Sequence, residues 1–306
     1  MDYLANIFGF NDETTDFLKN VPKFSIQSLI DKLPGEHFDT NDFLSDSITS
    51  KYYTPVEFIR EKFRKNKFSM LHLNIASLSA HIDELKSLLA ILEHPFEVIC
   101  LTETRIHEDK PKIDCKIEGY DFFHQKTGTQ CGGAGIYVKT VYNPVKIPKY
   151  TVTHENICET VFVEINGPSK KKLTIGCVYR HHTPVSDFID EFLFSTLNDI
   201  SKKNKTCILG GDFNVDLIKY GQVGCVDSFY DLITAHGYRP LILNPTRITD
   251  KSATLIDNFF INDLSCFSNG GNLTHSISDH FLQFVHLDIF EPLKEKNCSP
   301  KYARNW

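Results

Sequence analysis

From residue 68 onward, apolar residues occur in short runs whose spacing alternates between that of strands and that of helices. Residues 69–75, with Met70, Leu71, Leu73 and Ile75 as apolar residues, are predicted to form a strand. A second buried strand is predicted at residues 98–101. Between them, five residues at helical spacing define one apolar helix face: Leu78, Ile82, Leu85, Leu89 and Leu92. The stretch therefore predicts a strand–helix–strand unit with the two strands parallel.

The same pattern predicts more strands and two more helices downstream. The helices cover residues 186–200 and 227–236, the second with Asp227 as its cap and Gly237 as its stop. Asn166 and Gly167 lie between two predicted strands and favour a hairpin. The glycines at 132–133 enter a strand and no helix follows, so we interpret them as a close backbone approach and not as a dinucleotide-binding loop. The predicted strands are 134–138, 160–165, 173–179, 206–209, 254–261 and 281–285.

Residues 1–66 lack this regular pattern. They contain two predicted short helices, at residues 14–19 and 25–33, among many acidic and polar residues. We expect an acidic, loosely ordered N-terminal arm over 1–66, one domain over 67–290, and a tail or linker over 291–306. Because no chemistry is evident in the arm, we expect that deleting residues 1–60 leaves folding and activity unchanged.

Composition and charge narrow the class of protein. The chain has 306 residues of which 41% are hydrophobic, enough for a sizeable core. Its nine cysteines form no CxxC pair, which favours reduced thiols in an intracellular protein, nuclear or cytoplasmic. No signal peptide or membrane span is predicted. Residues 1–50 hold nine acids and three bases, which accounts for the whole net charge of −6. Residues 51–306 hold thirty acids and thirty bases. The charge of the chain therefore supports nucleic-acid binding only weakly.

Polar residues that could take part in catalysis or binding follow several of the predicted strands. Asp212 and Asn214 come after a buried run and two glycines; if the strand geometry continues, their side chains point the same way. Asn74 and Glu103 follow the two parallel strands, at the edge where open α/β sheets bind ligands. Each of these also suits an ordinary turn. Asp257 interrupts an apolar strand, where a carboxylate needs a partner, and the sequence supplies His280.

These residues occur in order within recognisable motifs, and the set resembles the endonuclease/exonuclease/phosphatase superfamily, which includes deoxyribonuclease I and the apurinic endonucleases. The motifs Leu-His-Leu-Asn-Ile-Ala-Ser-Leu, Val-Ile-Cys-Leu-Thr-Glu-Thr and Pro-Thr-Arg-Ile-Thr are similar to those in the endonuclease domain of non-LTR retrotransposon proteins of the jockey and CR1 type. The matching positions are Asn74 in Leu-Asn-Ile, Glu103 in Leu-Thr-Glu-Thr, Tyr179, Asp212 and Asn214 in Gly-Asp-Phe-Asn, Asp257 in Leu-Ile-Asp, and Asp279 and His280 in Ser-Asp-His.

The resemblance implies a role for each position. Glu103 would be the main ligand of a divalent metal, Mg²⁺ with Mn²⁺ as a substitute, with Asn74 beside it and Asp279 as an additional acid. Asp212 and Asn214 would position the attacking water and the phosphate, and the Tyr179 hydroxyl would bind phosphate. Asp257 would orient His280 against the scissile phosphate. Whether Asp212 or His280 is the base is left open.

Three further positions are expected to contact substrate. Thr246 matches a threonine of the retroelement members, and Arg180 follows Tyr179 at a strand end. Arg105 stands where relatives often carry tryptophan, so it is expected to alter substrate contacts more than chemistry.

The implied fold is a four-layer α/β sandwich like that of deoxyribonuclease I, two packed β-sheets flanked by helices. The implied function is a Mg²⁺-dependent endonuclease that nicks duplex DNA, gripped by its phosphate backbone, and leaves a 3′-hydroxyl that primes a reverse transcriptase whose domain is absent from this chain. The chain is then a fragment, a truncated copy or a stand-alone descendant. The alternatives are another phosphodiesterase or phosphatase of the superfamily, and an inactive relic that only binds nucleic acid.

Overall fold

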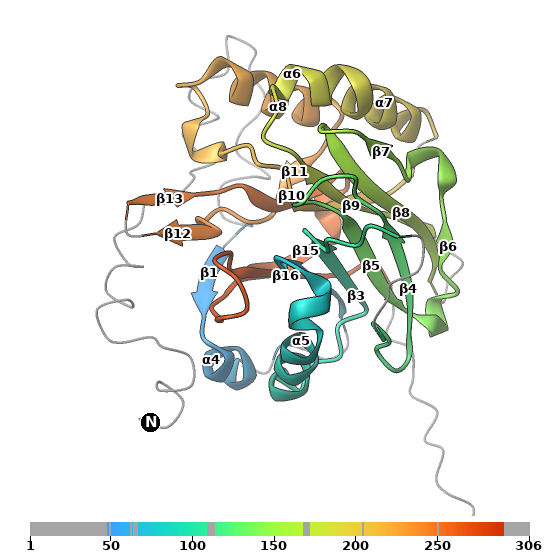
Figure 1. The fold of residues 1–306 in the computed structure, drawn as a ribbon, viewed down its shortest axis with the longest axis vertical. Helices are drawn as coiled ribbons and strands as arrows, with labels where there is room; N and C mark the ends of the chain where they lie inside the picture. The colour runs from blue at the N-terminus through green and yellow to red at the C-terminus, as the bar shows by residue number, and fades with distance from the viewer. Residues whose placement is uncertain are drawn as a thin grey trace, which may run out of the picture.

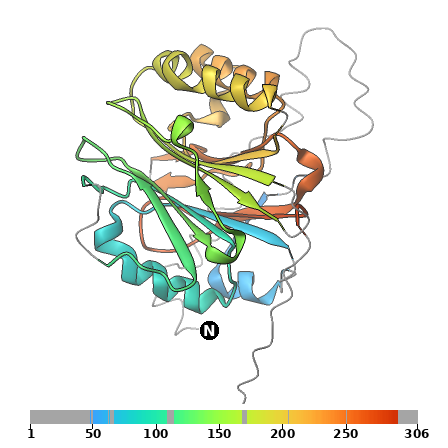
Figure 2. The ribbon, with the colours of Figure 1, turned by 90° about the vertical axis from the view of Figure 1, so that its right-hand side faces the viewer.

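Two mixed β-sheets pack face to face at the centre of the molecule, and helices cover the outer face of each (Figures 1 and 2). The computed structural model describes residues 48, 50–61, 63, 67–108, 114–167, 172–203, 205–249 and 251–290. The helices predicted at 14–19 and 25–33 and the tail at 291–306 lie outside these residues. The predicted four-layer α/β sandwich is confirmed.

The first sheet has the strand order β1-β15-β16-β2-β3-β5-β4. The strands β2 and β3 are parallel and the helix α5 connects them, so the predicted strand–helix–strand unit is confirmed. The strands are β1 (Ser50–Tyr53), β2 (Phe68–Asn74), β3 (Val98–Thr102), β4 (Tyr120–Gln125), β5 (Ala134–Lys139), β15 (Phe267–Leu273) and β16 (Leu282–Leu287).

The second sheet has the strand order β11-β14-β10-β9-β8-β6, with β7 also paired to β8. The strands β8 and β9 form the hairpin predicted around residues 166–167. The strands are β6 (Val145–Lys146), β7 (Thr153–His154), β8 (Cys158–Asn166), β9 (Lys172–Arg180), β10 (Cys207–Asp212), β11 (Arg239–Pro240) and β14 (Asp257–Ile261). A separate two-stranded hairpin is formed by β12 (Arg247–Thr249) and β13 (Ser252–Thr254).

Strand β2 illustrates why the central strands are apolar throughout. Met70 belongs to the core between the two sheets, whereas Leu71 and Leu73 belong to the core beneath α5. All seven residues of β2 are buried because both faces of the sheet are covered. His72 and Asn74 share the phase of Met70, and they therefore project toward the second sheet.

Helices form the outer layers. The helix α5 (Leu78–Leu92) covers the first sheet together with α4 (Pro55–Arg60) (Figure 1). On the second sheet, the predicted helix at 186–200 appears as α6 (Val185–Phe188), a π-helical turn at Ile189–Leu193, and α7 (Phe194–Lys202), beside α8 (Gly224–Ala235). Four short 3-10 turns complete the described elements: Thr140–Tyr142, Pro148–Tyr150, Leu217–Lys219 and Leu264–Cys266. No helix among the described residues is long and apolar enough to cross a membrane.

Residues 50–60, which the sequence assigns to the arm, are part of the domain. Strand β1 pairs in parallel with β15, and Thr54 begins α4 with a capping box that includes Glu57. Phe58 is 2% exposed and its ring packs against Phe63 and Phe284. Deleting residues 1–60 therefore removes an edge strand and a buried aromatic, so the structure leads us to expect that the deletion destabilises the fold, contrary to the expectation from the sequence.

Local details also differ from the prediction. Strands β4 and β15 were not predicted; β15 contains Gly270 and Gly271 and lacks a run of β-branched residues. A Cβ at Gly271 would lie 2.6 Å from the carbonyl oxygen of Lys51, so the polar, glycine-rich composition reflects tight pairing with β1. Asp227 is not the cap of α8, which begins after Val223; its carboxylate instead accepts a hydrogen bond from the backbone nitrogen of Gly221 at 2.6 Å.

Candidate active site

Strand direction brings the polar strand ends to one edge of the sandwich. Asn74 ends β2 and Asp212 ends β10. Strand β14 runs antiparallel to β10, so its first residue, Asp257, lies at the edge where β10 ends. Strand β16 runs antiparallel to β2 and begins just after His280, which places that residue at the same edge. Residues from separate strand ends therefore converge at one edge of the sandwich.

In the second sheet, the site is built on one row of residues across four adjacent strands. Glu159 on β8 pairs in register with Tyr179 on β9, Tyr179 with Asp212 on β10, and Asp212 with Asp257 on β14. Residues directly opposite one another project from the same face of a sheet. All four are at most 2% exposed. Burial, with the negative charges of Glu103 and Asp212 nearby, raises the pKa of Tyr179, so its hydroxyl keeps its proton.

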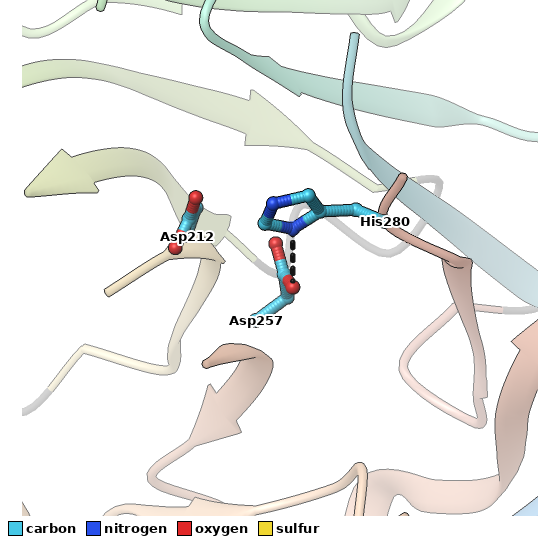
Figure 3. A group of neighbouring side chains, drawn as sticks. All are labelled: Asp212, Asp257 and His280. Carbon is cyan, nitrogen blue, oxygen red and sulfur yellow. Dashed lines mark hydrogen bonds and ion pairs between the residues drawn. The ribbon is translucent and has the colours of Figure 1, made fainter. Parts of the chain in front are cut away.

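Asp212, Asp257 and His280 form the most compact charged group of the site (Figure 3). One ligand atom from each lies within 4.8 Å of the others. His280 Nδ1 donates to Asp257 Oδ2 at 2.9 Å, and the Thr246 hydroxyl donates to the same oxygen at 2.6 Å. Burial alone would raise the pKa of Asp257, but the attraction of His280 outweighs it and lowers that pKa. Burial alone would lower the pKa of His280, but Asp257 raises it to about 9.

The loops after β2 and β3 contribute the second group of polar side chains. Asn74 Nδ2 donates to Glu103 Oε1 at 3.0 Å and to Asp212 Oδ2 at 2.9 Å, so one amide joins the two sheets. Arg105 Nη2 donates to Glu103 Oε2 at 3.0 Å. Glu103 and Arg105 have φ angles of 49° and 52°, a strained conformation for residues with a side chain, and such strain concentrates at functional sites.

The loop after Asp212 does not continue as a strand. Asn214 has a φ of 50°, and its side-chain amide donates to the carbonyl oxygen of Arg180 at 2.6 Å. The guanidinium of Arg180 is buried and donates to the backbone carbonyls of Phe213, Thr183 and Asn214 at 2.6–2.7 Å. The alternation argument for Asp212 and Asn214 is therefore wrong, because Arg180 and Asn214 clamp each other across a turn.

Two other predicted substrate or metal residues have protein partners. Thr246 is fully buried and contacts Asp257, so it lies behind that carboxylate and away from solvent. Asp279 is half exposed, and Arg247 donates to it at 2.8 Å from Nε and at 2.6 Å from Nη2.

The donor set fits a divalent cation. Glu103 and Asp212 present carboxylate oxygens to the same side-chain amide, that of Asn74, and carboxylate oxygen is the ligand type that Mg²⁺ prefers. Burial and the nearby charge of Asp257 raise the pKa of Asp212 to about 7, so a cation bound beside Asp212 would favour its charged form.

Several residues at the site were missed by the sequence analysis. His72 lies behind Asp257, with its Nδ1 2.6 Å from Gln283 Oε1 and its Nε2 3.0 Å from the Thr102 hydroxyl. Glu159 holds His181, whose Nε2 is 2.9 Å from Glu159 Oε2. The signal for Glu159 was in the sequence: it shares a strand phase with Val161 and Val163, both fully buried.

Comparison with solved structures finds the same fold in several nucleases. The endonuclease domain of TRAS1, a telomere-specific non-LTR retrotransposon, matches with a TM-score of 0.57 and 17% identity over 72% of this chain and 98% of that domain. An AP endonuclease from Leishmania major matches with a TM-score of 0.59 and 13% identity over 91% of this chain and 99% of its own. The catalytic domain of Xenopus laevis APE2 matches with a TM-score of 0.53 and 14% identity over 76% and 95%.

A search of curated proteins finds no significant sequence match. A family model does match, over residues 71–280, which includes every site residue described above from β2 to His280. That match covers more than half of the chain and agrees with the sheet topology and the order of the polar strand ends. The chain therefore belongs to the endonuclease/exonuclease/phosphatase family.

Proposed function

We propose that this protein is a Mg²⁺-dependent DNA endonuclease that nicks duplex DNA and leaves a 3′-hydroxyl. The observation that carries the proposal is the convergence of Asp212, Asp257 and His280 with the Asn74–Glu103 pair at one edge of two sheets. Members of this family are hydrolytic nucleases and phosphatases, and the TRAS1 neighbour is a retrotransposon endonuclease domain. By this proposal the natural partner is a reverse-transcriptase domain that uses the nick as a primer.

The metal would be held by Glu103 and Asp212, with Asn74 presenting its amide oxygen after rotation of the carboxamide. When bound, the cation would stabilise negative charge on the phosphate and on the leaving oxygen. Asp257 fixes the ring of His280 through Nδ1, which directs Nε2 into the site and lets it donate to a phosphate oxygen. Because His280 keeps its proton at neutral pH, we assign the water-activating role to Asp212.

Tyr179 and Arg105 would hold the substrate. The Tyr179 hydroxyl stays protonated beside Asp212 and can donate to a phosphate oxygen. The guanidinium of Arg105 is about one-third exposed while it contacts Glu103, so it can also reach a backbone phosphate. Arg180 and Thr246 act one step further from the substrate: Arg180 holds the 212–214 turn, and Thr246 holds Asp257.

The test is a plasmid assay with the full chain. Supercoiled plasmid is incubated with Mg²⁺, with Mn²⁺ and with chelator, and the nicked product is then offered to a DNA polymerase with and without phosphatase treatment. We expect metal-dependent nicks that the polymerase extends directly, and no nicking by the Asp212→Asn variant. Nicks that need phosphatase before extension would refute the product. Metal-dependent hydrolysis of a phosphoinositide without nicking would favour another family activity, and DNA binding without any hydrolysis would favour an inactive relic.

A further inference from the structure

The catalytic row of the second sheet carries an imidazole at each of its ends. At one end, Asp257 holds His280, as described above. At the other end, the equally buried carboxylate of Glu159 holds His181, whose Nε2 is 2.9 Å from Oε2 and 3.0 Å from Oε1. Tyr179 and Asp212 lie between the two pairs in the same register. The Glu159–His181 pair is thus a second dyad on the same row as the catalytic residues.

The surroundings of Glu159 are built to hold this dyad in place. Besides His181, the carboxylate accepts a hydrogen bond from the Thr127 hydroxyl at 2.8 Å and one from the backbone nitrogen of Gly133 at 3.3 Å. Gly132 makes room for it: a Cβ there would lie 2.8 Å from the Thr127 hydroxyl and 3.0 Å from both Glu159 Oε2 and His181 Cε1. The close backbone approach predicted from these glycines is therefore confirmed, and the Glu159–His181 pair is its cause.

His181 can act on something outside the protein. Its Nε2 is committed to Glu159, but no described residue accepts a hydrogen bond from its Nδ1. Its side chain is 12% exposed, compared with 6% for His280. Its ring meets that of Tyr179 edge to face, with centroids 5.0 Å apart, so the ring lies beside the proposed phosphate-binding hydroxyl. An imidazole that carries a proton on both ring nitrogens can donate one N–H to a buried carboxylate and the other to an anion.

We propose that the Glu159–His181 dyad binds a backbone phosphate of the DNA that flanks the reacting one. The inference deepens the proposed function and rests on it. Strands β8 and β14 are three strand intervals apart, roughly 14 Å, so His181 and His280 do not contact the same phosphate. A DNA strand advances about 3.4 Å per nucleotide along its axis, so a phosphate a few nucleotides from the nick lies within reach of His181. His181 and His280 would then contact two different phosphates of one DNA strand.

The test measures the salt dependence of DNA binding in full-length protein that carries Asp212→Asn to prevent cleavage. Each phosphate contact contributes about 0.9 to the slope of log Kd against log salt concentration. We expect His181→Ala to lower the slope by about that amount and to weaken binding at low salt about tenfold, as for the loss of one charge-assisted hydrogen bond. His181→Gln keeps an amide that can bond Glu159 and preserve the fold, but it has no second ring nitrogen to offer a phosphate, and we expect the same reduced slope.

The matched control is His236→Ala. His236 also has a bonded ring, with Nδ1 donating to the Leu232 carbonyl at 2.9 Å, but it lies at the end of α8, beside the end of β14 that is remote from Asp257. An unchanged slope in both His181 variants would overturn the proposal, as would an equal change in His236→Ala. A lower kcat with unchanged binding would also overturn it, since the dyad would then act only on Tyr179. Failure of the wild-type chain to nick or bind DNA would instead refute the proposed function itself.

Discussion

Replacing Asp257 with Asn removes a negative charge from the centre of the proposed active site, while the side chain keeps nearly the same shape. Asp257 Oδ2 receives the hydrogen bonds from His280 and Thr246, and an amide oxygen at that position can keep both. The amide nitrogen then takes the place of Oδ1, which is buried and has no hydrogen-bond partner; the nearest basic atom, Nδ1 of His72, is 3.9 Å away. The variant should therefore fold, and its main loss is the negative charge beside His280.

The size of the effect follows from the pKa of His280. Asp257 is the chief group that raises this pKa from 6.5 to about 9, against the effect of burial. A difference of that size corresponds to roughly 3 kcal/mol in favour of the imidazolium. Without that charge the pKa of His280 falls, because only the smaller effects of Asp212 and Asp279 still oppose burial, so less of the imidazole is protonated at pH 7.5 and it donates less strongly to phosphate. We expect kcat/KM for plasmid nicking to fall by about 10²- to 10³-fold at pH 7.5.

The pH dependence gives the reasoning a second check. In the wild type, His280 stays protonated below pH 9, whereas in Asp257→Asn its lower pKa means that the imidazolium returns only at a more acid pH. Nicking rates are therefore compared from pH 5.5 to 8.5, and the deficit of the variant should shrink toward acid pH. Asp288→Asn, an exposed partner of Lys67 at the far end of β16, is the control and should nick normally. A near-normal rate for Asp257→Asn at pH 7.5, or a deficit independent of pH, would refute the role assigned to the dyad.

Three predictions concern the fold. Phe58→Ala should lower the free energy of unfolding in urea by about 3–5 kcal/mol, whereas its exposed neighbour Ile59→Ala should change it little; an equally small effect of both would show that α4 is dispensable. Burial lowers the pKa of His286 to about 3, so its contribution to stability is complete above pH 6.5 and decreases as the pH falls; the urea midpoint should be lower at pH 5 than at pH 7.5, and less so in His286→Phe. Gly211→Ala should abolish soluble expression, because a Cβ there would lie 1.9 Å from a backbone carbonyl of β9, whereas Gly224→Ala, with open space around it, should be tolerated.

The sequence predicts the site residues that interrupt an apolar pattern at a strand end. Asn74, Glu103 and Asp212 each follow a buried run, and parallel strands bring such positions to one edge. Asp257 was found because a carboxylate inside an apolar strand needs a partner. The same argument applies to Glu159, but its strand contains a second glutamate, Glu164, on the opposite face, and the pattern alone looks like an ordinary half-exposed strand.

The sequence could not predict the register between neighbouring strands or the hydrogen-bond partners of individual side chains. The row from Glu159 to Asp257 depends on the alignment of β8, β9, β10 and β14. Helices and loops separate β9 from β10 and β10 from β14 along the chain. The role of Arg180 depends on a turn in which Asn214 adopts a left-handed conformation, and no periodic pattern predicts that. Strand β15 was missed because it contains two glycines, which are not typical of strands; Gly271 allows close contact with Lys51 of β1, and Gly270 with Phe284 of β16.

The position of β15 and β16 has a consequence for how the protein is made. These late strands insert between β1 and β2, which are close together early in the chain. Met70 pairs with Val285, so β2 leaves the ribosome more than 200 residues before its neighbour in the sheet. At a synthesis rate of 5–20 residues per second, the apolar edge of β2 stays unpaired for roughly 10–40 seconds. During that time the nascent chain exposes a strand edge that can pair with another chain, so the risk of aggregation lasts until β16 has been synthesised.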